Sequence, residues 1–183
     1  MISRDEANKL LAEKITDTYT LVHSKMVAHA MEKYAKKNNK EVDLYFITGL
    51  LHDLDWTKEV QENPDKHGTI STELLATFDC PMEMVQAIKA HASNHTGVMP
   101  VSNLDFALIA CDEVCGLLHA YSLMRPEGFN GLKLSSLRKK FNDENFAAKI
   151  DRDLILVGVN GINTDIDSHL TFLTEAFDNY VAG

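Results

Sequence analysis

The most informative segment of the chain is residues 42–56, VDLYFITGLLHDLDW. Its first ten residues are apolar on almost every side, a pattern typical of a helix at the centre of a core. His52 and Asp53 follow directly and end this helix. Because the C-terminus of a helix carries partial negative charge, it favours a nearby cation. We therefore expect a central helix whose C-terminal end presents side chains able to bind a positive ion.

The rest of the chain also has the periodicity of helices. Apolar residues recur at spacings of three and four, and alternation of period two is scarce. The pattern predicts an all-α fold with helices over 3–14, 18–37, 42–53, 68–78, 82–92, 103–123 and 164–181, and shorter ones near 134–140 and 151–157. Within 18–37 we expect Tyr19 on the buried face, and Gly158 and Gly161 predict a turn between two helices.

Composition limits the class of protein. The chain has 183 residues, enough for one self-sufficient core, so we expect a single domain over residues 1–183. Its net charge of −9 argues against binding to a nucleic-acid polymer, which needs a basic surface. Three cysteines give no disulfide framework, the N-terminus has no apolar signal core, and the apolar stretch 104–124 contains three acidic residues. These features predict a cytoplasmic protein, a monomer or homodimer, with no membrane span.

Several imidazole and carboxylate side chains occupy positions that the pattern otherwise assigns to the core. They are His23, His52, Asp53 and Asp112, and His67, after a polar loop, and His91, at the end of helix 82–92, add to this set. The clearest is Asp112, which lies in the middle of the apolar helix 103–123, where a carboxylate needs a cation or hydrogen-bond donors. Each residue alone is compatible with an ordinary buried hydrogen bond. Together they predict a site for a divalent ion such as Mn²⁺, Fe²⁺, Co²⁺, Ni²⁺ or Zn²⁺.

The order of these residues, in the segments LVHSKMVAHAM, GLLHDLDW and ALIACDEV, resembles the HD-domain metal-dependent phosphohydrolase superfamily. The resemblance implies an all-α helical bundle over about residues 18–124, followed by a short helical extension over about 125–183. It also implies the ligands of one divalent metal ion, which are His23, His52, Asp53 and Asp112.

A narrower resemblance extends to about residue 155. The strings HDLDW, KHGTISTELL, IKAHASNHTG, DEVCGLLHA, RPEGF and SLRKKFNDENFAAKI are similar to a subgroup of predicted HD-superfamily hydrolases. In dinuclear HD enzymes additional histidines hold a second metal ion, and His67 and His91 occupy such positions, with His95 four residues further on. Asp53 would then bridge the two ions. The alternatives are that His67 caps the following helix and that His91 contacts phosphate. The resemblance thus implies one or two divalent ions, with Mn, Fe, Co, Ni, Zn and Mg all open.

The activity that the resemblance implies is hydrolysis of a nucleotide or another small phosphate ester by a metal-activated water, as a phosphatase or a phosphodiesterase. Asp53 would orient the water or accept its proton. The phosphate also needs local cations in this acidic chain. Lys58 is the expected catalytic lysine, since a lysine shortly after the His–Asp pair recurs in related patterns, and Arg125 and Lys139 are further candidates for the phosphate. The alternative for all three is a solvated surface position.

The sequence is also compatible with two other interpretations. A non-catalytic HD module could bind metal and nucleotide for regulation, although 183 residues leave little room for an output domain. Asp112, Cys115 and His119 share a helix face and could imitate a zinc site, whereas Cys111 and Cys115 are more simply core residues. Asp55 and Glu113 could take part in acid–base chemistry or be structural.

Overall fold

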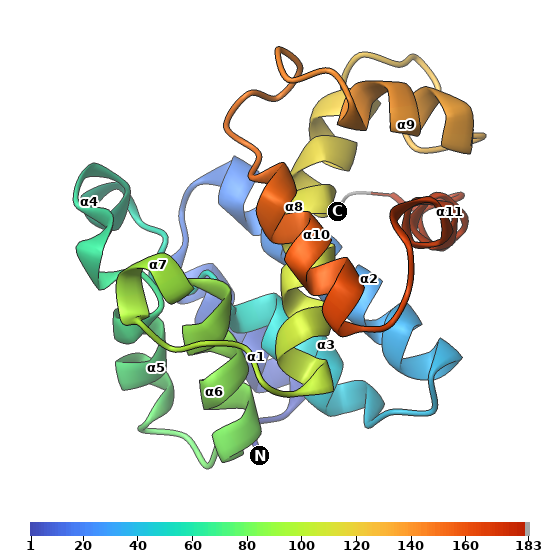
Figure 1. Ribbon diagram of the computed structural model, residues 1–183. Coiled ribbons are helices and arrows are strands. Elements are labelled where there is room, and N and C mark those ends of the chain that lie inside the picture. The colour runs from blue at the N-terminus through green and yellow to red at the C-terminus, as the bar shows by residue number, and fades with distance from the viewer. Residues whose placement is uncertain (182–183) are drawn as a thin grey trace.

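The computed structural model describes residues 1–181, and this part of the chain is all-helical, as the sequence predicts (Figure 1). It contains eleven α-helices, one 3₁₀ helix and no strand within these residues. The N-terminal elements are α1 (Arg4–Lys14), α2 (Thr18–Lys37), α3 (Val42–Leu51), α4 (Lys58–Glu62), η1 (Pro64–Lys66) and α5 (Thr69–Leu75). The others are α6 (Met82–His91), α7 (Ser93–Thr96), α8 (Asn103–Ser122), α9 (Leu134–Phe141), α10 (Arg152–Gly161) and α11 (Ile166–Ala176).

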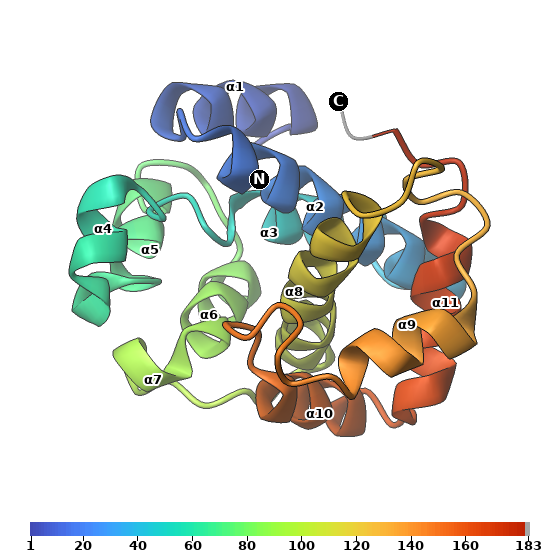
Figure 2. The ribbon, with the colours of Figure 1, turned by 90° about the horizontal axis from the view of Figure 1, so that it is seen from above.

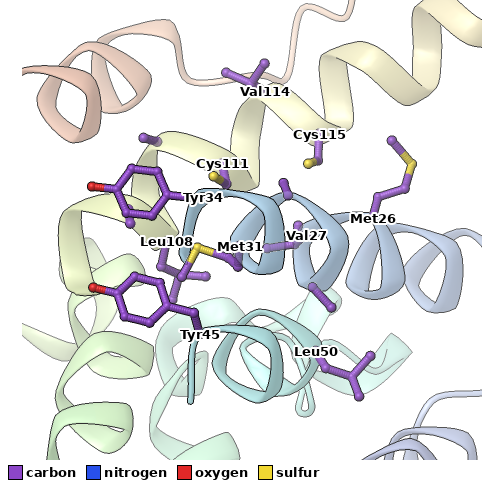
Figure 3. Packing of buried hydrophobic residues seen from close by; sticks show 14 of the residues in the cluster. Met26, Val27, Met31, Tyr34, Tyr45, Leu50, Leu108, Cys111, Val114 and Cys115 are labelled. Atoms are coloured by element: carbon purple, nitrogen blue, oxygen red, sulfur yellow. The ribbon is translucent and has the colours of Figure 1, made fainter. Parts of the chain in front are cut away.

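The centre of the bundle is formed by α2, α3 and α8, which pack against one another. Figure 3 shows their interlocking side chains, with Met31 of α2, Leu50 of α3 and Leu108 of α8 among them. Cys111 and Cys115 are fully buried in the same core, which confirms the simpler of the two predictions for these cysteines. The near-total apolarity of α3 follows from this central position.

Polar side chains cap the N-termini of the two long helices, α2 and α8. Asp17 accepts a hydrogen bond from the Thr20 N–H at the start of α2, and Ser102 forms a capping box with Asp105 at the start of α8. The buried carboxylate of Asp105 is thereby satisfied by backbone N–H groups. No helix within residues 1–181 is long and apolar enough to cross a membrane.

The C-terminal helices lie against the central bundle (Figure 2). α10 runs along α8, and the predicted turn at Gly158 and Gly161 is wrong because both glycines belong to α10. A Cβ atom on Gly158 would lie 2.8 Å from the Ala110 Cα, and one on Gly161 would overlap the Phe106 ring. Gly158 is therefore explained by the close approach of the α8 backbone, and Gly161 by the Phe106 ring packed against it, rather than by a turn.

The other predicted helices are confirmed, with the largest differences at the C-terminal ends of α10, which continues to Gly161, and of α11, which ends at Ala176 instead of residue 181. Three short elements, α4, η1 and α7, were not predicted. These elements lie together in the segment between α3 and α8 (Figure 1). One face assignment is wrong, because Tyr19 is 51% exposed instead of buried. The single-domain organisation stays a prediction.

Candidate metal centre

The four side chains that the sequence predicts as metal ligands meet at the junction of α2, α3 and α8. His23 comes from the N-terminal half of α2, His52 and Asp53 follow the last residue of α3, and Asp112 comes from the middle of α8. The Nε2 atoms of His23 and His52 lie 2.8 and 3.3 Å from the same oxygen, Asp112 Oδ1. Three separate helices thus bring two imidazoles and two carboxylates to one point.

A second pair of histidines approaches the other side of Asp53. His67 Nε2 and His91 Nε2 lie 3.5 and 3.4 Å from Asp53 Oδ1, whereas His52 Nε2 lies 3.5 Å from Oδ2. Each oxygen of this carboxylate therefore faces a different set of imidazoles. Asp53 occupies the position that a ligand shared between two ions would need.

Hydrogen bonds on the outer side of the imidazoles orient three of them. The Nδ1–H of His52 donates to the Gly49 carbonyl over 2.8 Å, and that of His91 donates to the Ile88 carbonyl. His67 Nδ1 pairs with Asp55 Oδ1 at 2.9 Å. A histidine whose Nδ1 carries the proton presents its Nε2 lone pair to the opposite side, the arrangement found around protein metal sites.

Asp55 has a positioning role that the sequence left open. Its second oxygen accepts the backbone N–H groups of Gly68 and Ser71, each over 2.9 Å, at the start of α5. Gly68 itself is in the left-handed conformation, with φ of 76°, and it occupies the N-cap position. The prediction that His67 could merely cap this helix is therefore wrong. Asp55 instead ties the start of α5 to the His67 ring.

The donor set suits a divalent cation. His23 Nδ1, His52 Nε2 and His91 Nε2 are buried and make no hydrogen bond within residues 1–181. Burying a polar atom without a partner costs free energy, and a metal ion would satisfy His52 Nε2 and His91 Nε2, which both face Asp53. Two groups offer three ligand atoms within 4.8 Å of one another, namely His23, His52 and Asp112, and His52, Asp53 and His91. Imidazole and carboxylate ligands match first-row divalent metals.

The buried imidazoles and carboxylates of this centre shift one another's pKa values. Burial alone lowers the pKa of His52, but the charges of Asp53 and Asp112 outweigh it and raise that pKa to about 9. Burial also opposes ionisation of Asp53 and Asp112. The neighbouring imidazoles outweigh this effect and hold the pKa values of both carboxyl groups below the usual range. Beside them, burial and the charge of Asp112 raise the pKa of Glu113 to about 8.

A cavity of about 280 Å³ gives access to the centre, and His23, Asp53, His67, His91 and Asp112 all line it. His95 and Glu113, both candidates from the sequence, also line it. Its other walls include residues that the sequence did not indicate as part of a site, which are Tyr19, Thr20, Trp56, Ala92, Asn94, Gly116, Ile150, Asp151 and Leu154. Trp56, the one tryptophan of the chain, directly follows HDLD, and its position was the available signal. Nothing in the sequence connects the segment 150–154 with His23.

The predicted phosphate-binding cations do not line this cavity. The Lys58 side chain is 90% exposed and lies 3.9 Å from Glu62. Arg125 donates to the Asn130 carbonyl and lies over the Tyr121 ring, and Lys139 lines a separate groove along α9. By contrast, His95 does line the cavity, with its ring centre 6.0 Å from that of His67.

The alternative zinc site on one face of α8 is not formed. His119 stacks against Tyr19 with ring centres 5.0 Å apart, and Cys115 is buried in the core. Among the described residues, neither group of converging ligands contains Cys115 or His119. The ligand-bearing part of α8 is Asp112.

Comparison with known families agrees with this geometry. The profile of the HD domain matches residues 20–119, more than half of the chain, and the chain belongs to the HD-domain family. The matched region holds all four predicted metal ligands and ends within α8, so that α9, α10 and α11 follow it. Searches of curated proteins and of solved structures gave no match.

Proposed function

We propose that this protein is a divalent-metal-dependent phosphohydrolase that acts on a nucleotide or another small phosphate ester. The observation that carries the proposal is the convergence of imidazole Nε2 atoms on the Asp53 and Asp112 carboxylates within an HD domain. HD domains are in general metal-dependent phosphohydrolases. The phosphatase and phosphodiesterase subtypes both stay open.

The residues have distinct parts in the proposed reaction. His23, His52, Asp53 and Asp112 would hold one ion, and His67 and His91 would hold a second with Asp53. A bound divalent ion supplies a Lewis acid and lowers the pKa of water toward neutrality. Asp53 lines the cavity, and in the proposed reaction its carboxylate would orient the attacking water or accept its proton.

The cavity supports a small substrate. Its volume of about 280 Å³ is near the lower end of the range for small-molecule sites. Tyr19 and Trp56 add aromatic surface to its walls, and the Trp56 and His67 ring centres lie 4.6 Å apart. An aromatic surface beside a phosphate site suits a nucleotide, while the size also admits smaller phosphate esters.

One observation favours a second candidate, a non-catalytic module that binds metal and nucleotide. No Lys or Arg lines the cavity in the described part of the chain, so a leaving group would have no cationic side chain beside it. This candidate predicts tight metal and ligand binding without turnover.

Phosphate release from a panel of mononucleotides, dinucleoside polyphosphates and cyclic nucleotides tests the proposal. Reactions supplied with Mn²⁺, Co²⁺, Ni²⁺ or Fe²⁺ are compared with the same reactions of the Asp53→Ala protein, after far-ultraviolet circular dichroism has shown equal helicity. For the cyclic nucleotides and the dinucleoside polyphosphates, the nucleotide products are measured directly, because neither cleavage releases inorganic phosphate. We expect turnover in the native chain and none in the variant. Equal turnover in both proteins would place the chemistry elsewhere, and metal binding without turnover would favour the non-catalytic module.

A further inference from the structure

The walls of the cavity have an unusual charge composition. Four acidic residues line it, namely Asp53, Asp112, Glu113 and Asp151, and no Lys or Arg does so within residues 1–181. Asp53 and Asp112 belong to the candidate metal centre. Glu113 and Asp151 do not, and the proposed function gives them no role.

Glu113 and Asp151 form a pair on the side of the cavity where α8 meets the start of α10. Glu113 Oε2 accepts the Asp151 backbone N–H over 3.2 Å, and Asp151 Oδ1 accepts the Leu154 N–H over 2.9 Å as the N-cap of α10. Each carboxyl group uses one oxygen for these contacts. Both residues line the cavity, so the second oxygen of each can form a hydrogen bond with a ligand there.

This pair disfavours some ligands and favours others. A ligand with a second anionic group would place that group near the Asp151 carboxylate, and no Lys or Arg of the described residues lines the cavity to pair with it. At separations of several ångströms near a protein surface, each such pair of charges weakens binding by a few-fold to about tenfold. Hydroxyl and ammonium groups, in contrast, donate hydrogen bonds to carboxylates. The volume of about 280 Å³ leaves little room for more than one phosphate with a small organic part.

We infer that the site selects a ligand with a single phosphate group whose organic part is uncharged or cationic and donates hydrogen bonds to Glu113 and Asp151. The inference rests on the proposed function for the location of the phosphate at the metal centre. It narrows the substrate class, because polyphosphates and phosphate esters with a carboxylate are selected against.

Calorimetric titration of the Mn²⁺-loaded protein tests the selection without turnover. The probes are 3-aminopropylphosphonate, 3-hydroxypropylphosphonate and 3-phosphonopropionate, which share one phosphonate and differ in the charge of the second group. At pH 8.5 we expect the amine and the hydroxyl compounds to bind at least about tenfold more tightly than the carboxylate. Equal affinities, a reversed order or no binding of any of the three would overturn the inference.

Substitutions then assign the selection to the pair. Glu113→Gln and Asp151→Asn replace each carboxyl group with a neutral amide that keeps an oxygen acceptor, and Asn is a good N-cap. Asp153→Asn is the matched control, since Asp153 is exposed on the same helix and does not line the cavity. We expect the double variant to reduce the tenfold preference to less than about threefold and the control to retain it. An unchanged preference in the double variant would overturn the assignment.

Turnover separates this inference from the proposed function. AMP, ADP and ATP are compared, as are glycerol 3-phosphate and 3-phosphoglycerate. If the three phosphonates bind in the expected order of affinity but no compound is turned over, the phosphohydrolase proposal is contradicted and the ligand selection stays in place. Turnover that favours ATP over AMP, or 3-phosphoglycerate over glycerol 3-phosphate, would leave the phosphohydrolase in place and overturn the selection.

Discussion

Two regions of this protein bury histidine in opposite ways. His169 of α11 is 2% exposed, and its Nε2–H donates to the Ala110 carbonyl over 2.8 Å. His52 is fully buried, but its Nε2 atom faces Asp53 and Asp112 and makes no hydrogen bond. Burial lowers the pKa of His169 to about 4, whereas the carboxylates raise that of His52 to about 9. A buried histidine therefore indicates a metal site only where lone pairs and carboxylates converge.

The same substitution in both places gives the largest expected difference. His52→Gln removes an imidazole lone pair from the metal centre, and we expect turnover to fall by at least about a thousandfold, because a metal ion contributes several kcal/mol of transition-state stabilisation. His169→Gln keeps a donor for the Ala110 carbonyl, and turnover per folded molecule should be unchanged. Steady-state kinetics of the two proteins provide the measurement. A comparable loss of turnover in both variants would contradict the different roles given to His52 and His169.

The contact between α8 and α10 is expected to respond in stability rather than in metal binding. In Gly158→Ala the new Cβ would overlap the Ala110 backbone, and overpacking of this kind lowers the free energy of unfolding by about 3 kcal/mol. Val157→Ala, at a 46% exposed position of the same helix, is the control and should change it by less than about 0.5 kcal/mol. Urea denaturation measures both, and equal midpoints would show that the two helices do not approach this closely.

His169 also predicts a specific dependence of stability on pH. Its pKa is about 4 in the folded chain and about 6.5 in the unfolded chain, so the unfolded state takes up the proton first as the pH falls. Its contribution is complete above pH 6.5 and is lost as the pH falls through 4, which amounts to about 3 kcal/mol. The free energy of unfolding, measured from pH 7.5 to 4, should therefore fall further in the native chain than in His169→Gln. Parallel curves for the two proteins would contradict the lowered pKa of His169 in the folded chain.

The smallest expected effect concerns the number of ions. Because His67 and His91 face one oxygen of Asp53 and His52 faces the other, we expect two ions per chain in the native protein. The double variant His67→Ala/His91→Ala should retain one. Inductively coupled plasma mass spectrometry after equilibrium dialysis gives the count. An unchanged count would assign these histidines to substrate contact or to structure.

The sequence predicts much of this molecule, and the reasons are local. Helical periodicity is set by residues three and four apart, so most helices are evident from the sequence itself. The polar residues of the centre are conspicuous because they interrupt apolar helices, as Asp112 does in α8. The family resemblance then supplied the roles that spacing alone could not.

What the sequence did not predict depends on contacts between distant segments. Gly158 resembles a turn residue until α8 is seen to pack against it. Tyr19 follows the apolar stripe of α2, but at this end of the helix the stripe faces the cavity instead of the core. Glu113 and Asp151 are 38 residues apart in sequence and meet only because α10 folds back on α8.

The central claim is that the histidine and aspartate cluster binds divalent metal through nitrogen and oxygen ligands. X-ray absorption spectroscopy at the cobalt edge of Co²⁺-loaded protein tests it most directly. We predict a first shell of nitrogen and oxygen only, with the multiple scattering of at least two imidazoles, and its loss in His52→Gln. A sulfur ligand in the first shell, or a spectrum that His52→Gln leaves unchanged, would contradict the account.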